Sequence, residues 1–505
     1  MVNCSEGDCL ALRPRFQPPP LTKDSAEWKC LDSQVPPEHV ARRIVAAIER
    51  LDLTPLLASY SGRGSLAVPP KQMLAVVLIE KHRKRQSPGD WYIDLKENVV
   101  LRWAGLGIRP SRSVCYEFRD RLGKHLEQWN KDVLCQAKAV GMTDGTDGAI
   151  DGSSIAACAS RQRLLNQEQL NSRIEKLTAR CDQSQPTEQN EKPPAWMAAT
   201  ADGRKAQLNR FEQAVEALQP RLDANARRMP SLRLPVKRVV ISPSDPEAAL
   251  GPDKFKVFRP LYNALFVSDM NSPLILSYEV FDHGQDTALL EPMLRRTRDF
   301  VGPQFHRVVG DSGFVTGTNL AHCDAAGVEL IGPWKENDYT KRKQKKQEKF
   351  VKDKFLWLET DHAYQCPAGQ RLERMGSERR QRAGDQEETL ERFGCRAATC
   401  AACPLRSQCT DSRGGRQLRR SEHEPLIEAH RAKMNTPEAK ATQKRRGQTA
   451  ERGFADLKEH RNLRRITGRG IACARTDVGL CVLTRNLLTL HDHLTTESPS
   501  AAAAP

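Results

Sequence analysis

The sequence lacks the features of a membrane-spanning or secreted protein. Its 505 residues contain no run of the roughly 18–20 apolar residues that a bilayer span needs. The longest apolar stretch, Val478 to Leu490, is interrupted by Arg485 and Asn486. The first residues do not form the basic and then apolar pattern of a secretory signal, and no internal repeat is recognisable. We therefore expect a cytoplasmic protein of two to four domains, with no membrane partner.

What the sequence has in excess is positive charge. Lys and Arg total 79 against 63 Asp and Glu, which gives a formal net charge of +16 and a pI near 9.3. Hydrophobic residues make up 39%, enough for a sizeable core. A basic protein of this kind has nucleic acid as its first expected partner, and the expected place is the cytoplasm.

Composition and periodicity divide the chain into six parts. We expect a disordered, Pro-rich arm and, at the other end, a disordered Ser/Ala/Pro tail. Between them lie a helical domain of DNA-binding type, an α/β core in two pieces, and a basic and Cys-rich insertion. The predicted ranges are 1–35 (arm), 36–140 (helical domain), 141–335 (first part of the core, with a helical insertion at 160–230), 336–420 (basic and Cys-rich insertion), 421–492 (C-terminal helices of the core) and 493–505 (tail).

The core pattern alternates strands and helices, which predicts an α/β fold with a mixed sheet. Asp151 and Asp311 each end an apolar strand and are followed by Gly or Ser-Gly. If these strands are neighbours, both carboxylates leave the same edge of the sheet and can share a cation. Asp144 and Asp147 are alternatives for the first acid. The acids Asp245 and Asp286 fit turns or helix caps better.

A third acid, Glu451, lies in a strongly basic segment. Residues 430–470 contain 12 Lys or Arg and 4 Asp or Glu, a net +8, which is half the formal charge of the chain. Lys458 follows Glu451 by seven residues, close to two helical turns, so both fall on one helix face. Carboxylates that hold two Mg²⁺ or Mn²⁺ ions, beside cations that hold phosphate, are the groups that phosphodiester chemistry uses. The candidate DNA-binding residues are Arg446, Arg452, Lys458, Arg461, Arg464 and Arg465.

Five of the fifteen cysteines are clustered. Cys400, Cys403 and Cys409 lie close together, with Cys366 and Cys395 upstream. Clustered cysteines in a cytoplasmic chain indicate metal binding before disulfides. Four thiolates suit a closed structural zinc site, for which Cys366, Cys400, Cys403 and Cys409 are the candidate ligands and Cys395 is the alternative to Cys366. Free thiols in a loop-rich insertion are the other interpretation.

The blocks around the three acids resemble those of DDE transposases of bacterial insertion sequences. The third block, Glu451-Arg-Gly-Phe-Ala-Asp-Leu-Lys458, has the Glu, six residues, then Lys of that class. The Ser244-to-Ala248 block, Cys366-Pro-Ala-Gly369 and Cys403-Pro-Leu-Arg406 resemble the eleven-eighty-two group. Two positions depart from the family pattern: Lys444 stands where a Tyr is common, and Gly447 where an Arg is common, although Arg446 is adjacent.

The resemblance implies an RNase H-like core, a helical N-terminal domain and a zinc-ribbon-like insertion. It further implies that Asp151, Asp311 and Glu451 hold two Mg²⁺ (or Mn²⁺) ions, cut DNA at the terminal inverted repeats of the element and join the ends to target DNA. A homodimer would bring two ends together. The alternatives are a zinc-containing DNA-binding protein derived from a transposase, without catalysis, and a related nuclease without strand transfer.

Overall fold

The computed structural model describes residues 13–181, 193–253, 255–283, 286–334, 349–381 and 387–496. For Gln381, Glu451, Arg452 and Phe454 it describes the backbone and not the side chain. The basic run at 341–348 and the expected tail from 497 onward lie outside the described residues. Within the described parts of the chain, no helix is sufficiently long and apolar to cross a bilayer.

The N-terminal region is helical, as predicted. Its helices bury apolar faces against one another. At most 1% of the surface is exposed at Ile44, Leu74, Trp91 and Trp129. The helices are α1 (Ala26–Gln34), α2 (Val40–Ile48), α3 (Thr54–Ala58), α4 (Pro70–His82), α5 (Pro88–Glu97), α6 (Val99–Ala104), α7 (Arg112–Leu122) and α8 (Leu126–Ala139).

The expectation of a disordered arm over 1–35 is corrected for its second half. Residues 26–34 form α1, with Ser25 as its N-cap. Leu31 and Val35 are buried, and the Trp28 indole donates to the Trp103 carbonyl at 3.2 Å. These apolar contacts offset the entropy of ordering a short helix that follows a Pro-rich stretch. Residues 1–12 of the expected arm lie outside the described residues.

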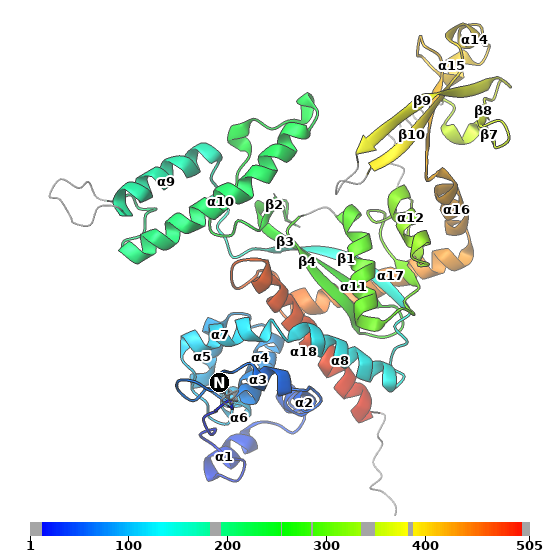
Figure 1. The fold of residues 1–505 in the computed structure, drawn as a ribbon. Coiled ribbons are helices and arrows are strands. Elements are labelled where there is room, and N and C mark those ends of the chain that lie inside the picture. Colours follow the sequence, from blue (N-terminus) through cyan, green and yellow to red (C-terminus); the bar gives the residue numbers. More distant parts are fainter. Residues whose placement is uncertain are drawn as a thin grey trace, which may run out of the picture.

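The central sheet has the strand order β4–β3–β1–β5–β6, with the short strand β2 also paired to β3. β1, β3 and β4 are antiparallel, whereas β5 and β6 run parallel to β1. Figure 1 shows helices on both faces, with α11 and α17 among them. The elements are β1 (Asp147–Ala156), β2 (Ala249–Pro252), β3 (Phe258–Asp269), β4 (Ile275–Phe281), η3 (Asp286–Leu289), α11 (Leu290–Val301), β5 (Arg307–Val309), α12 (Gly317–Ala325) and β6 (Glu329–Ile331).

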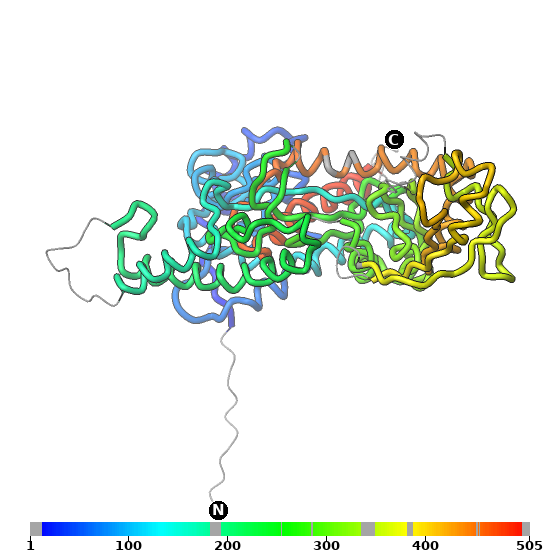
Figure 2. Tube along the Cα trace, turned by 90° about the horizontal axis from the view of Figure 1, so that it is seen from above, coloured from blue at the N-terminus to red at the C-terminus, as the bar shows by residue number. Residues whose placement is uncertain are grey.

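Two insertions project from opposite sides of the sheet (Figures 1 and 2). The first is the predicted helical pair, α9 (Gln167–Cys181) and α10 (Ala201–Arg227), with its own apolar core around Leu170, Leu177 and Leu218. After the helical pair, Ile241 forms an isolated β-bridge with Leu165. Two short 3-10 turns, η1 (Pro230–Leu232) and η2 (Val236–Arg238), precede it.

The second insertion is a five-stranded antiparallel sheet in the order β11–β10–β9–β8–β7, with short helices at the cysteines. Phe393 and Leu372 are buried in its core. Its elements are η4 (Lys352–Lys354), β7 (Leu356–Leu358), β8 (Ala363–Gln365), β9 (Arg371–Gln381), β10 (Glu387–Gly394), α14 (Ala397–Ala401), α15 (Arg406–Cys409) and β11 (Gln417–Ser421).

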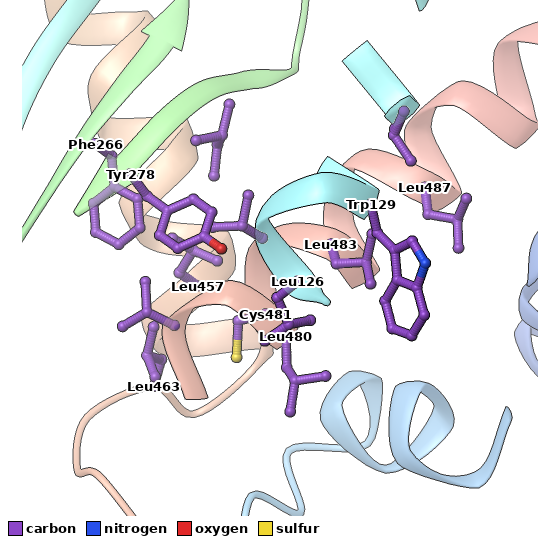
Figure 3. Close-up of a cluster of buried hydrophobic side chains, with 14 of the residues drawn as sticks. Leu126, Trp129, Phe266, Tyr278, Leu457, Leu463, Leu480, Cys481, Leu483 and Leu487 are labelled. Atoms are coloured by element: carbon purple, nitrogen blue, oxygen red, sulfur yellow. The ribbon is translucent and has the colours of Figure 1, made fainter. Parts of the chain in front are cut away.

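The C-terminal helices return to the sheet. They are α16 (Glu424–Met434), α17 (Pro437–Ala455), the π-helix η6 (Asp456–His460) and α18 (Ile471–Thr496). Figure 3 shows Leu480, Leu483 and Leu487 of α18 in one cluster with Leu126 and Trp129 of α8 and with the sheet residues Phe266 and Tyr278. The last helix therefore lies between the N-terminal helices and the sheet, and it joins the two into one core.

Candidate active site at the open edge of the sheet

The register of β1 and β5 brings two of the predicted acids together. Asp147 to Ala149 pair in parallel with Arg307 to Val309, and the pairing ends at Ala149 and Val309. Asp151 lies two residues beyond this point on β1, and Asp311 lies two residues beyond it after β5. Since the strands run in the same direction, both acids emerge at the same edge. The two strands are neighbours, as expected, across 160 positions of sequence. The expectation that Asp151 ends its strand is wrong, because β1 continues to Ala156 through its pairing with β3.

A glycine keeps the two chain segments close. A Cβ at Gly310 would lie 3.3 Å from Cγ2 of Ile150 and 3.2 Å from Cβ of Phe314. These contacts are tighter than most side chains tolerate, so a larger residue would push the Asp311 loop away from β1. The loop is closed by the Gly313 amide, which donates to Asp311 Oδ1 at 2.7 Å. The Asp311 carboxylate is thus held in a tight turn beside Ile150 and Asp151.

Asp151 is surrounded by charges of both signs. Its Oδ1 accepts from the Gly152 amide at 2.9 Å and lies 3.4 Å from Nη2 of Arg446. Burial raises the pKa of Asp151, Arg446 opposes this, and the carboxylates of Asp311 and Asp286 raise it further. A divalent cation would relieve the repulsion between the carboxylates, and carboxylate oxygens are the ligands that Mg²⁺ and Mn²⁺ prefer. The acids are thus of the chemical kind that such an ion prefers, although their described side chains are not gathered closely enough to hold one by themselves.

Helix α17 crosses the sheet on the face where Asp151 lies. Ala450 packs with Ala149 and Val309, and Arg445 Nη2 donates to the Met270 carbonyl at 2.9 Å. Glu451 is the next residue of this helix. Its side chain, like that of Arg452, lies outside the described residues. The backbone of Glu451, the third predicted acid, therefore lies on the helix that covers β1 and β5. A metal-ligand role for the Glu451 side chain stays a prediction.

Lys458 lies at the edge of the same site. It belongs to η6, and its ammonium contacts the Ser153 hydroxyl and lies 3.5 Å from the Ser154 carbonyl. Ser153 follows Asp151 by two residues on β1 and so points to the same face of the sheet. The helix changes from α to π at Asp456, so the segment between Glu451 and Lys458 is not a regular α-helix, and the expectation that the two share a face stays a prediction.

The arginines after Lys458 differ in exposure. Arg461 is buried and donates to Asp456 Oδ2 at 2.9 Å, and Arg465 donates to the carbonyls of Ala157 and Ala159 at 3.3 Å. Arg461 is thus a buried support of the segment, with little surface for the expected DNA contact, whereas Arg465 is exposed and its expected DNA contact stays a prediction. Arg464 is half exposed and paired with Glu459.

The two acids assigned to turns or caps have different surroundings. Asp245 accepts from the Tyr262 hydroxyl at 2.6 Å and from the Gly470 amide at 3.2 Å, so it ties β3 to the segment before α18. Asp286 lies directly against Gly152, beside Asp151. Sequence reasoning missed this proximity, since nothing in the local pattern links residue 286 to β1.

The five clustered cysteines line one small cavity of the second insertion, with Arg416 among its other walls. Burial raises the pKa of Cys409, Arg416 lowers it, and the thiols of Cys366, Cys400 and Cys403 raise it further. Burial and the neighbouring Cys400 thiol raise the pKa of Cys395. Among the described residues, no group of three or more His, Cys, Asp or Glu side chains is gathered closely enough to hold a metal ion. This applies to the cysteines and to the acids alike.

Comparisons with known proteins agree with this arrangement. Residues 365–491 match the family model described as a transposase DDE domain, and residues 29–121 match the one described as a transposase domain (DUF772). The first match includes the cysteines and Glu451 but begins after Asp151 and Asp311. No curated protein and no solved structure matches the chain.

The DDE domain implies an RNase H-like core, and the central sheet has the strand order expected of one, with Asp151 on its first strand and Asp311 after the strand that pairs in parallel with it. The chain carries a transposase DDE domain together with an N-terminal DUF772 transposase domain, and it is a catalytic transposase by that measure.

Proposed function

We propose that this transposase cuts DNA at the ends of an insertion sequence and joins those ends to target DNA, with Asp151, Asp311 and Glu451 as its catalytic acids. The observation that supports this most strongly is the parallel register of β1 and β5, which aligns Asp151 with Asp311. We place the element in the eleven-eighty-two group, on the cysteine and Ser244–Ala248 blocks. The site of action is chromosomal DNA, in the bacterial cytoplasm.

Three carboxylates would hold two Mg²⁺ or Mn²⁺ ions, which supply activation of the attacking oxygen and stabilisation of the leaving one. The residues around the two Asp carboxylates would orient them for the reaction. Arg446 balances the charge of Asp151, and the Gly152 and Gly313 amides fix the orientation of the two Asp carboxylates. Lys458, on the same face of β1, is the group placed to bind the phosphate next to the bond that is cut.

DNA would follow the basic segment away from the acids. The proposed contacts are Arg446, Arg452, Lys458, Arg464 and Arg465, while the buried Arg461 supports the segment through Asp456. The Ala156 amide donates to the Arg464 carbonyl at 3.1 Å, and the Ile466 amide donates to Ala156 at 2.9 Å. The segment is therefore attached to the end of β1, so the cations and the acids keep a fixed relation. A homodimer would hold the two ends of the element together.

We also propose a structural Zn²⁺ in the Cys-rich insertion. Four of the five thiols that line the cavity are sufficient. The proposed set is Cys366, Cys400, Cys403 and Cys409, with Cys395 as the alternative to Cys366. The mutual repulsion of these thiols when ionised is what a bound cation would remove. Zinc would stabilise the end of a small sheet that otherwise has a limited core.

The test uses purified full-length protein, DNA with the element ends, and Mg²⁺ or Mn²⁺. We expect the wild type to cut and join, and Asp151→Asn, Asp311→Asn and Glu451→Gln to bind the ends without cutting. Equal cleavage by wild type and Asp311→Asn would refute the assignment. Cleavage without joining would favour the nuclease, and binding without cleavage by any form would favour the non-catalytic DNA-binding protein.

Zinc is tested separately by elemental analysis of the wild type and of Cys403→Ser, with Cys135→Ser as the matched control because Cys135 is exposed on α8, away from the cluster. We expect one zinc per chain in the wild type and in the control, and less in Cys403→Ser. A wild-type protein without stoichiometric zinc would refute the proposal of a structural Zn²⁺.

A further inference from the structure

The helical insertion ends in a continuous exposed segment that combines cations with large apolar side chains. Every residue from 226 to 238 is exposed. The segment has no Asp or Glu, and its cations are Arg227, Arg228, Arg233, Lys237 and Arg238. Four of the eleven exposed large apolar side chains in the described part of the chain also lie here, namely Met229 (65% exposed), Leu232 (59%), Leu234 (44%) and Val236 (59%). Apolar side chains gathered on the surface mark an interaction site, and the charge indicates an anionic partner.

This 226–238 segment is held in one conformation, although it is exposed. Asn225, which is buried at the end of α10, donates from Nδ2 to the Leu234 carbonyl at 2.8 Å and accepts at Oδ1 from the Leu234 amide at 2.9 Å. Arg233 Nε donates to the Arg228 carbonyl at 2.8 Å, and Asn166 Nδ2 donates to the Lys237 carbonyl at 3.3 Å. A surface that is already ordered loses less conformational entropy when a partner binds.

A polar groove of about 440 Å³ adjoins the segment at Lys237. Arg173 and Lys176 of α9 also line it, and the Arg173 guanidinium lies 4.8 Å from the centre of the Trp196 ring. One acid lines the groove as well. Glu168 lies 3.7 Å from Lys237, but both side chains are highly exposed, so this pair is weak and does not remove the positive character of the groove. Three cations around a groove are the groups that hold a phosphate of the DNA backbone.

The insertion lies next to the basic segment that leads away from the active site. Burial lowers the pKa of Arg210 in α10, and the nearby charge of Arg469 lowers it further. Arg469 belongs to the basic segment of residues 430–470. Arg221 of α10 donates to the carbonyls of Pro246 at 3.0 Å and Ala248 at 2.8 Å, just before β2. The insertion is therefore attached to the central sheet, and DNA that follows the basic segment would meet it.

We propose that the helical insertion is a further DNA-binding surface of this protein, with backbone phosphates in the groove at Arg173, Lys176 and Lys237 and with the apolar side chains of the 226–238 segment packed against sugars and bases. This inference rests on the proposed function, because it takes DNA as the partner. Proteins that bind duplex DNA commonly combine cations with apolar side chains that contact the bases. A second copy of the chain is a poorer partner, since a symmetric contact would place two positive segments against each other.

The test measures binding of the full-length protein to DNA carrying the element ends, by fluorescence anisotropy at several salt concentrations. Divalent metal is left out, so cleavage does not enter the result. We expect Arg173→Gln with Lys237→Gln to lower the slope of log K against log salt by about two, because two phosphate contacts are lost. The matched control is Lys71→Gln with Arg295→Gln, which removes two charges from exposed ion pairs of α4 and α11 and should keep the wild-type slope.

A second variant tests the apolar part of the surface. Met229→Ser with Leu232→Ser should weaken DNA binding at every salt concentration without changing the slope, because apolar contacts release no counterions. Thermal unfolding checks that each variant keeps the fold. A wild-type slope for Arg173→Gln with Lys237→Gln would overturn this inference alone, whereas a wild type that binds no DNA would refute the proposed function too. If the apolar variant binds DNA as the wild type does, and instead dissociates a dimer seen by sedimentation without DNA, the segment is a contact between copies and the inference is overturned.

Discussion

The ammonium of Lys81 lies 2.9 Å from the carboxylate of Asp477, and both side chains are completely buried. The pair joins α4 of the N-terminal domain to α18. Lys81 also donates to Gln86 Oε1 at 2.7 Å, and Asp477 accepts from the amide and hydroxyl of Thr467 at 2.8 Å. Thr467 belongs to the basic segment attached to β1. The N-terminal domain thus supports the segment that is proposed to bind DNA.

Lys81→Met is predicted to destabilise the protein by about 3–5 kcal/mol, because it leaves the Asp477 charge buried without its partner. Lys81→Met combined with Asp477→Leu should cost less than the sum of the two single variants. Urea unfolding measures both. Lys71→Met is the control: its pair with Glu49 is exposed, and its loss should cost about 0–1 kcal/mol. Equal costs for the two Lys variants would contradict the prediction.

Lys458→Gln is predicted to weaken binding to DNA carrying the element ends and to lower the slope of log K against log salt by about one. The reason is that a phosphate contact releases a counterion, whereas a residue that only supports the fold does not. Binding is measured by fluorescence anisotropy at several salt concentrations. Arg295→Gln, an exposed arginine of α11 paired with Glu291, should leave the slope unchanged. An unchanged slope for Lys458→Gln would remove it from the DNA surface.

The protein is predicted to lose stability as the pH falls from about 6.5 toward 4. Burial and the nearby Arg461 lower the pKa of His82 to about 4. The unfolded chain binds a proton at His82 near pH 6.5, before the folded chain does, so acid favours unfolding in this window. Below about pH 4 this residue has no further effect. Thermal unfolding of wild type and His82→Asn across pH 4–7 should show a shallower loss in the variant.

Gly148→Ala is predicted to destabilise the sheet by about 1–3 kcal/mol through overpacking. A Cβ at this position in β1 would collide with Cγ1 of Val267 and touch Phe305. Gly447→Ala is the matched control, since a Cβ there meets nothing within 4 Å and lies within α17, where alanine is preferred to glycine by about 1 kcal/mol. We expect the free energy of unfolding to fall in Gly148→Ala and to rise in Gly447→Ala.

The sequence was sufficient for the features that depend on local pattern. Acids that follow apolar residues predicted that Asp151 and Asp311 lie on neighbouring strands, although Asp151 lies inside β1 and not at its end, and local pattern predicted the helical insertion at 160–230. The other features of the fold and of the site depend on tertiary contacts. The burial of Arg461 against Asp456 and the contact of Asp286 with Gly152 join elements that are not adjacent in the chain, and no composition or spacing reports them.

Two local features also escaped prediction. Helix α1 follows a Pro-rich stretch and is stabilised by contacts with residues such as Trp103 that lie some 75 positions away. The change from α to π geometry at Asp456, in the turn that carries Lys458, has no sequence signal of its own.

The packing of α18 limits the order in which the parts of the protein can fold during synthesis. This last helix fills the space between α2, α4 and α8 on one side and β3 and β4 on the other. During synthesis the N-terminal helices leave the ribosome more than 300 residues before their partner does, so their core stays incomplete until the final segment emerges. The helix that carries Glu451 also emerges late. A chain interrupted before residue 471 would lack the helix that unites the two halves, so premature termination yields no competent enzyme.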